Sequence, residues 1–272
     1  YGCEDPRITY FNGTFYIFYT ALSVYPFAAH GIKTAVATTT DFKTFKKYPV
    51  SNFNAKAMAL FPERINGKLA ALITINTDLP PAKIAIAYFD REEDMWSSYY
   101  WQEWYDNANE HIIHLLRDMR DQIELGSPPI KTEDGWLVIY SYIKNYMSDE
   151  KIFGVEAVLL DFENPQKIIG RTDYSLLEPE MDYEKFGDVP DITFPSGALV
   201  HGDTLYLYYG AADTRTCLAT CKLEDLLEKL RPKPHQHFSP AVETAAKYKF
   251  MRFGENPILQ PTLELSWQNR CV

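Results

Sequence analysis

Short apolar segments joined by tight turns recur four times along the chain. They cover residues 8–19, 64–73, 130–142 and 198–209, and their turns contain Gly13, Gly67, Gly135 and Gly202. Gly, Asn and Asp tolerate the positive φ angles that such turns need, and turns of this kind join antiparallel strands. The pattern therefore predicts four β-hairpins at nearly even spacing.

Each hairpin is followed by one more apolar segment that ends at an acidic residue. These segments are residues 34–41, 84–90, 157–161 and 217–224. A repeat of this length built only from antiparallel strands is typical of a β-propeller. We therefore expect an all-β propeller whose innermost strands, near Ile8, Arg64, Ile130 and Ala198, surround a central channel. The residues just before each hairpin are then the candidates for chemistry.

The repeats predict one propeller over residues 1–230, closed by a short helix at residues 223–230. An insertion, residues 92–120, interrupts the second repeat, and its apolar positions near residue 113 indicate a short helix or strand. Residues 231–247 read as a proline-rich linker. We expect residues 248–272 to open a second or permuted propeller copy, and we favour a piece of a tandem protein over a permuted order.

Composition agrees with one large all-β domain. Of the 272 residues, 46% are hydrophobic and 15% are aromatic, which suits a core, strands and sugar-stacking surfaces. The net charge of −10 is spread along the chain and argues against nucleic acid or an anionic membrane as partner. No run reaches the roughly 18 apolar residues of a membrane span. No signal peptide is visible, so we expect a cytoplasmic protein.

Neither the cysteines nor the histidines have the spacing of a metal site. Cys217 and Cys221 lie close together, but no second pair completes a zinc site, so they are interpreted as structural thiols. His111 and His114 are near neighbours in sequence and lack an evident third ligand. We therefore expect no metal and no cofactor.

Carboxylates gather in the segments that lead into the innermost strands. These segments are residues 2–8, 57–64, 123–130 and 187–197, and each has a proline beside a strand start. Glycosidic cleavage needs one protonated carboxylic acid at the leaving oxygen and a nucleophile or base on the other face of the ring. Acids that converge on a channel among many aromatics therefore predict carbohydrate chemistry.

Five motifs, in order over residues 1–222, resemble glycoside hydrolase family 130, which contains mannoside phosphorylases and β-mannosidases. They are the Glu4-Asp5-Pro6-Arg7 run, residues 60–68, residues 126–130 with 135–137, residues 187–190 with 194–195, and residues 208–213. The resemblance implies a five-bladed β-propeller, of which this chain represents about four blades. It also implies an inverting mechanism on β-mannosides.

The resemblance assigns roles to individual residues. Asp5 corresponds to the general acid, whose proton is thought to pass through a sugar hydroxyl in the phosphorylases. Asp188 and Asp213 match positions that line the sugar site. The remaining substrate-binding candidates are Glu4, Arg7 and Lys56.

The basic cluster that holds phosphate in the family's phosphorylases is largely missing. Its positions correspond here to Thr74, Gln122, Ser141 and Phe153, with only Lys56 retained. A phosphate dianion needs several charge-assisted hydrogen bonds to offset its desolvation. Glu124 stands where the phosphorylases have Gly, and a carboxylate there would repel phosphate but could activate water. The pattern favours an inverting β-mannosidase with Asp5 as acid and Glu124 as base.

Two other interpretations stay open: a β-mannoside phosphorylase with an altered phosphate site, and a non-catalytic carbohydrate-binding propeller in a tandem protein. The expected partner is a β-mannoside oligosaccharide, with inorganic phosphate as a possible second substrate. If the first interpretation holds, Asp5 and Glu124 face one cavity at a separation of about 6.5–9.5 Å.

Overall fold

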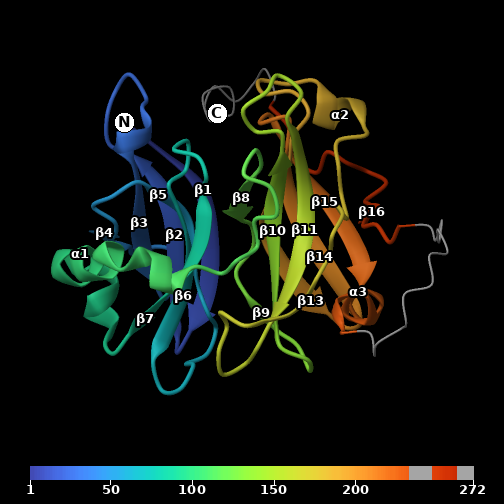
Figure 1. Cartoon of the computed structure of the whole chain (residues 1–272). Coiled ribbons are helices and arrows are strands. Elements are labelled where there is room, and N and C mark those ends of the chain that lie inside the picture. Colours follow the sequence, from blue (N-terminus) through green and yellow to red (C-terminus); the bar gives the residue numbers. More distant parts are fainter. Residues whose placement is uncertain (233–246, 262–272) are drawn as a thin grey trace.

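The computed structural model describes residues 1–232 and 247–261, and four antiparallel sheets make up most of this part of the chain (Figure 1). The sheets are arranged as the blades of a β-propeller, which confirms the all-β prediction. Across the described residues no helix is long and apolar enough to cross a membrane.

The first blade contains β1 (Gly2–Phe11), β2 (Thr14–Leu22), β3 (Ile32–Thr39) and β4 (Lys46–Pro49). The second contains β5 (Ala55–Leu60), β6 (Leu69–Ile75) and β7 (Lys83–Phe89). The third contains β8 (Gln122–Leu125), β9 (Ile130–Lys131), β10 (Trp136–Lys144), β11 (Ile152–Leu160) and β12 (Ile168–Arg171). The fourth contains β13 (Thr193–His201), β14 (Thr204–Ala211), β15 (Arg215–Lys222) and β16 (Met251–Arg252).

Short helices lie within the first blade, between blades and after β15. The α-helices are α1 (Ser98–Asp106), α2 (Asp182–Lys185) and α3 (Leu223–Leu230), and the 3₁₀ turns are η1 (Ala29–Gly31), η2 (Glu92–Trp96) and η3 (Ala108–His111). Helix α3 confirms the predicted closing helix. The helix of the insertion forms earlier than expected, because Trp101 and Trp104 of α1 bury their rings against the second blade. Ile112 instead makes an isolated bridge to Ala85.

The predicted turns form where glycine and asparagine allow them. Asn12 and Gly13 have φ values of 47° and 85°, and Asn66 and Gly67 repeat this geometry at 49° and 80°. The innermost strands are placed less accurately by the sequence. Arg64 lies in a turn after β5, and the strand expected at Ile130 is divided into β8 and β9. Prolines account for both differences, since Pro62, Pro128 and Pro129 cannot donate to a ladder.

Apolar side chains fill the three spaces between consecutive blades. Successive residues of a strand point to opposite faces, so Ile73 of β6 packs toward the first blade and Leu72 toward the third. The third and fourth blades share a further core, which includes Cys217, Cys221 and the apolar face of α3. Strands β6, β7, β10 and β11 of the two middle blades are buried on both faces.

The outward faces of the first and fourth blades are less covered. Ile8 and Tyr10 of β1 are 48% and 57% exposed, and Leu199 of β13 is 46% exposed. Both blades still have one fully packed face, because they border the second and third blades respectively. Within the described residues, no sheet lies over these two outward faces.

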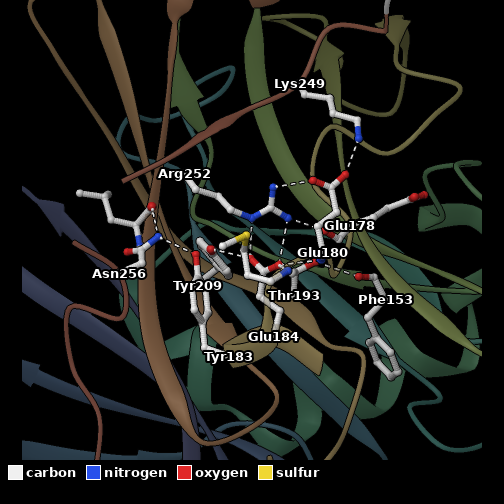
Figure 2. A network of polar contacts seen from close by, with 12 residues as sticks. Phe153, Glu178, Glu180, Tyr183, Glu184, Thr193, Tyr209, Lys249, Arg252 and Asn256 are labelled. Atoms are coloured by element: carbon white, nitrogen blue, oxygen red, sulfur yellow. Dashed lines mark hydrogen bonds and ion pairs between the residues drawn. The ribbon is translucent and has the colours of Figure 1, made fainter. Parts of the chain in front are cut away.

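Residues after the proline-rich stretch return to the fourth blade. Strand β16 pairs with β15, and Asn256 exchanges hydrogen bonds with the main chain of Leu218. Figure 2 shows Arg252 reaching from this segment to Glu184, which is fully buried. Most of the predicted linker and residues 262–272 lie outside the described residues, so the division of the chain into domains stays a prediction.

Candidate active site

Asp5 and Glu124, predicted from different blades, meet at one ammonium group. Lys56 Nζ lies 3.2 Å from Asp5 Oδ2 and 3.6 Å from Glu124 Oε2. The two carboxylate oxygens are therefore no farther apart than the sum of these distances. Because this is an upper limit, these two oxygens lie at or below the lower end of the roughly 6.5–9.5 Å carboxyl separation that inverting glycosidases use, and the predicted separation stays a prediction. The three side chains come from β1, β5 and β8.

β1 and β5 each contain a β-bulge at the corresponding place, and these bulges orient the side chains of Asp5 and Lys56. One extra residue interrupts the β1 ladder between Glu4 and Arg7, and one interrupts the β5 ladder between Lys56 and Ala59. Asp5 has φ 51°, and the corresponding Ala57 has φ 54°. Bulges of this kind redirect side chains next to active sites. A positive φ at Asp5 is a strained conformation that the surrounding blade must hold in place.

Arg7 braces the two carboxylate-bearing strands. Its guanidinium donates 2.8 Å and 2.9 Å hydrogen bonds to the carbonyls of Gly126 and Leu125, next to Glu124, and a 2.7 Å bond to the carbonyl of Asp5. The side chain is fully buried. These bonds commit Arg7 to the main chain, so a direct contact of Arg7 with substrate stays a prediction.

The two acids have opposite pKa shifts. Burial alone would raise the pKa of Asp5, but Lys56 and Arg7 outweigh it and hold that pKa below its usual value. For Glu124, burial dominates and raises the pKa, and the nearby charge of Asp5 adds to the rise although Lys56 opposes it. Glu124 therefore holds a proton more readily than an ordinary glutamate.

Further carboxylates border this group. Burial raises the pKa of Glu4, and the charge of Asp5 adds to the rise. Burial also raises the pKa of Asp213, with contributions from Asp5 and the more remote Asp188. The predicted residues Glu4, Asp5, Asp213 and Glu124 thus share one electrostatic environment, whereas Asp188 is exposed at its border.

Three residues at the site were missed from sequence. The hydroxyl of Tyr146 donates to Asp78 Oδ1 at 2.5 Å, across 68 positions of chain, and the charges of Asp78 and Glu124 both act on this tyrosine. The Phe194 ring centroid lies 5.4 Å from Lys56 Nζ. Phe194 is part of one of the family motifs, and no other feature of the sequence indicated that it lies at the site. Nothing in the sequence pairs Asp78 with Tyr146.

Three positions of the missing phosphate cluster lie on the strands of Lys56 and Glu124 or on the strands paired with them. Thr74 pairs with Lys56 across β5 and β6, and Ser141 pairs with Glu124 across β8 and β10. Gln122 lies on β8 two positions before Glu124. Thr74, Ser141 and Gln122 are all buried, and each is uncharged. Among the described residues no group of His, Cys, Asp and Glu side chains has the arrangement of a metal site.

Comparisons with known proteins agree on the fold and on one group of enzymes. A family model described as beta-1,4-mannooligosaccharide phosphorylase matches residues 1–231. The 1,2-beta-oligomannan phosphorylase of Thermoanaerobacter sp. (strain X514) is 34% identical over 83% of this chain and 70% of its own length. The beta-1,2-mannobiose phosphorylase of Listeria innocua is 33% identical over 85% of this chain and 60% of its own length.

A solved structure extends this likeness to three dimensions. The Listeria innocua beta-1,2-mannobiose phosphorylase, in complex with β-1,2-mannobiose, superimposes with a TM-score of 0.69 and 30% identity. The alignment covers 84% of this chain and 60% of that one. The chain thus spans about 60 to 70% of the length of these relatives.

Proposed function

This chain belongs to glycoside hydrolase family 130, and from that membership we propose that it hydrolyses β-mannosides with inversion at the anomeric carbon. Asp5 is the general acid and Glu124 the base that activates water. The single observation that carries the proposal is the ion pair of Lys56 with both Asp5 and Glu124.

Charge balance at Lys56 favours water over phosphate as the nucleophile. The one ammonium is already shared by two carboxylates, and Glu4 and Asp213 add negative charge nearby. A phosphate dianion placed here would meet Glu124, and the ammonium within ion-pair distance of Glu124 is already shared with Asp5, so little remains to offset the desolvation of phosphate. A neutral water molecule carries no such penalty.

The environment of Glu124 suits a base. Its side chain is buried, and its pKa is raised, so it accepts a proton from water more readily than an exposed glutamate. Water attacks the anomeric carbon as Glu124 removes its proton, and Asp5 supplies a proton to the departing glycosidic oxygen, directly or through a sugar hydroxyl. Lys56 and Arg7 favour the ionised form of Asp5, so the reaction uses the fraction of molecules in which Asp5 carries a proton and Glu124 does not.

Phosphorolysis is the second candidate, because the curated relatives are named as phosphorylases. In that case Lys56 holds phosphate, and its bonds to Asp5 and Glu124 rearrange when phosphate enters. A third candidate is sugar binding without turnover.

The experiment offers the protein β-1,2- and β-1,4-mannobiose with and without phosphate and follows the products by NMR. Hydrolysis predicts free mannose, initially as the α anomer, at a rate indifferent to phosphate. Asp5→Asn lowers this rate by roughly 10²–10⁴-fold, the usual contribution of general acid catalysis. Phosphate-dependent mannose 1-phosphate would establish phosphorolysis instead, and binding without product would establish a binding module.

A further inference from the structure

The insertion that interrupts the second repeat forms a cavity of about 360 Å³ against β7. The residues that line it lie on β7, on α1 and η3, and between these two helices. None of them belongs to the group at Lys56. In Figure 1, α1 lies on the left of the molecule, away from β8, which carries Glu124. The cavity is therefore separate from the candidate active site, and its volume is in the range of small-molecule sites.

Hydrogen bonds to the second blade hold the walls of this cavity in place. The hydroxyl of Tyr100 donates to the carbonyl of Tyr88 at 2.8 Å, and the indole N–H of Trp104 donates to the carbonyl of Ile86 at 3.1 Å. The His111 ring stacks on Trp104, with ring centroids 5.2 Å apart and planes at 12°. The packing of α1 on β7 thus forms the cavity without a ligand.

Aromatic side chains form much of the cavity wall, and none of the described residues that line it is a lysine or an arginine. The side chains of Tyr88, Tyr100 and His111 are half-buried, so part of each remains open to a ligand. Burial lowers the pKa of His111 despite the opposing charge of Glu110, so its ring is neutral at pH 7. The faces of aromatic rings carry a negative potential and attract cations.

Two carboxylates of the cavity have no partner among the described residues. The side chains of Glu103 and Glu110 are exposed, and neither forms an ion pair or accepts a hydrogen bond from a described residue. Other surface acids are paired, as Asp118 is with Arg120. The segment 90–110 also carries seven acidic residues and one basic residue. The cavity therefore repels anions and attracts cations.

We propose that this cavity binds an organic cation, namely an ammonium group that carries apolar substituents. Glu103 and Glu110 balance its charge, and the rings of Tyr88 and Tyr100 contact its substituents. A metal ion does not fit, because among the described residues no group of acids and histidines has the arrangement of a metal site. A neutral sugar gains nothing from the two unpaired charges. The inference goes beyond the proposed function and does not depend on it.

The test measures the binding of choline to the whole protein by calorimetry. Choline has a quaternary ammonium group, and its carbon isostere has the same shape but carries carbon in place of the charged nitrogen. We expect the isostere to bind at least about tenfold more weakly than choline, because it gains neither the Coulomb nor the cation–π attraction.

Variants locate the binding of choline in this cavity. Glu103→Gln and Glu110→Gln are each expected to weaken it about threefold, whereas Glu93→Gln, at an exposed acid of the same insertion outside the cavity, changes it less than about twofold. Tyr88→Leu removes one ring and weakens it about threefold or more. Tyr99→Leu, at a 79% exposed tyrosine of α1 that does not line the cavity, is the control and leaves the affinity unchanged.

Each result decides the matter. Equal binding of choline and its isostere overturns the proposal, and so does choline binding that both Glu103→Gln and Glu110→Gln leave unchanged. The absence of saturable choline binding overturns it as well. If β-1,4-mannotriose binds and Tyr88→Leu weakens its binding while choline does not bind, the cavity is a sugar site instead. Mannose release does not enter this test, so this proposal and the proposed function can fail independently.

Discussion

Two buried glutamates of this propeller have opposite surroundings. Glu184, at the start of the fourth blade, receives two hydrogen bonds from Arg252, at 2.8 Å and 2.9 Å, and one from the hydroxyl of Tyr209 at 2.8 Å. The main-chain amides of Glu180 and Met181 donate two more. Glu124 accepts no hydrogen bond from any described residue and faces only the ammonium of Lys56, at 3.6 Å.

The pKa values follow this difference. Burial acts to raise the pKa of both groups, but the donors around Glu184 outweigh it and lower that pKa. At Glu124 burial prevails and the pKa rises. A buried carboxylate that accepts a hydrogen bond at every position stabilises the fold. A buried carboxylate without such donors can still accept a hydrogen bond or a proton from water or substrate. Figure 2 shows the side chains of Arg252 and Tyr209 directed at Glu184.

Replacing glutamate by glutamine should therefore lower activity at position 124 and lower stability at position 184. Glu124→Gln removes the base and lowers mannose release by at least roughly 10²–10⁴-fold, while the free energy of unfolding changes by less than about 1 kcal/mol. Glu184→Gln leaves activity per folded molecule intact but lowers stability. Steady-state rates of mannose release and urea unfolding curves of both variants measure these effects. A fully active Glu124→Gln protein would show that Glu124 is not the base.

We call Glu184 with its five hydrogen bonds the closed centre, and Asp5, Lys56 and Glu124 the open centre. Arg252→Met tests the closed centre by removing the cation instead of the carboxylate. The variant leaves Glu184 buried without its cation, which costs about 3–5 kcal/mol in unfolding free energy. Lys249→Met is the matched control, because Lys249 pairs with Glu180 at the surface and such a pair contributes less than about 1 kcal/mol. Equal losses in the two variants would mean that burial of Glu184 does not matter.

The closed centre also predicts an acid dependence. The folded pKa of Glu184 lies below its ordinary value of 4.5, so its stabilising effect is complete above pH 4.5 and is lost as the pH falls through the folded pKa. Arg252→Met removes the largest of the contributions that lower this pKa. The difference in unfolding free energy between the two proteins should therefore shrink as urea titrations are moved from pH 6 toward pH 3.

The charge of Lys56 affects the pKa values of Asp5 and Glu124, and the dependence of activity on pH should report this effect. Lys56 lowers the pKa of Asp5 and opposes the rise at Glu124, so Lys56→Met raises both pKa values. A base must be deprotonated and an acid protonated, so both limbs of the kcat/KM profile move to higher pH, by about one unit for each 1.4 kcal/mol of lost attraction. Profiles that coincide would show that Lys56 does not control these groups.

The sequence predicted the parts of this comparison that depend on local pattern or on motifs. Hairpin turns followed from Asn12-Gly13 and its repeats, and the family motifs with Glu124 pointed to carboxylates that the fold brings together at Lys56. What it did not predict depends on contacts between distant segments. Arg7 bonds to carbonyls more than a hundred positions away, so its residue type alone suggested substrate binding.

The sequence also did not predict the hydrogen bonds around Glu184, because they too join segments that are distant in the chain. Glu184 and Arg252 are 68 positions apart, and Arg252 lies in a segment that the sequence assigned to the opening of a second or permuted propeller copy. A glutamate in a short helix gives no sign of whether donors will surround it. Helix α1 was misplaced because tryptophan burial against the second blade, a tertiary effect, decides where the insertion becomes helical.

The smallest expected effect concerns one donor of the closed centre. Tyr209→Phe removes a single hydroxyl from Glu184 and leaves four other donors in place. We expect a loss of about 1–1.5 kcal/mol in unfolding free energy, the usual contribution of one buried hydrogen bond. Tyr208→Phe, on the opposite face of β14, is the matched control and should cost almost nothing, because no described residue bonds to its hydroxyl. If Tyr209→Phe costs as much as Arg252→Met, the centre behaves as one cooperative network in which no donor is dispensable. If it costs nothing, the remaining donors already satisfy the carboxylate, and the contrast with Glu124 rests on Arg252 and the two main-chain amides.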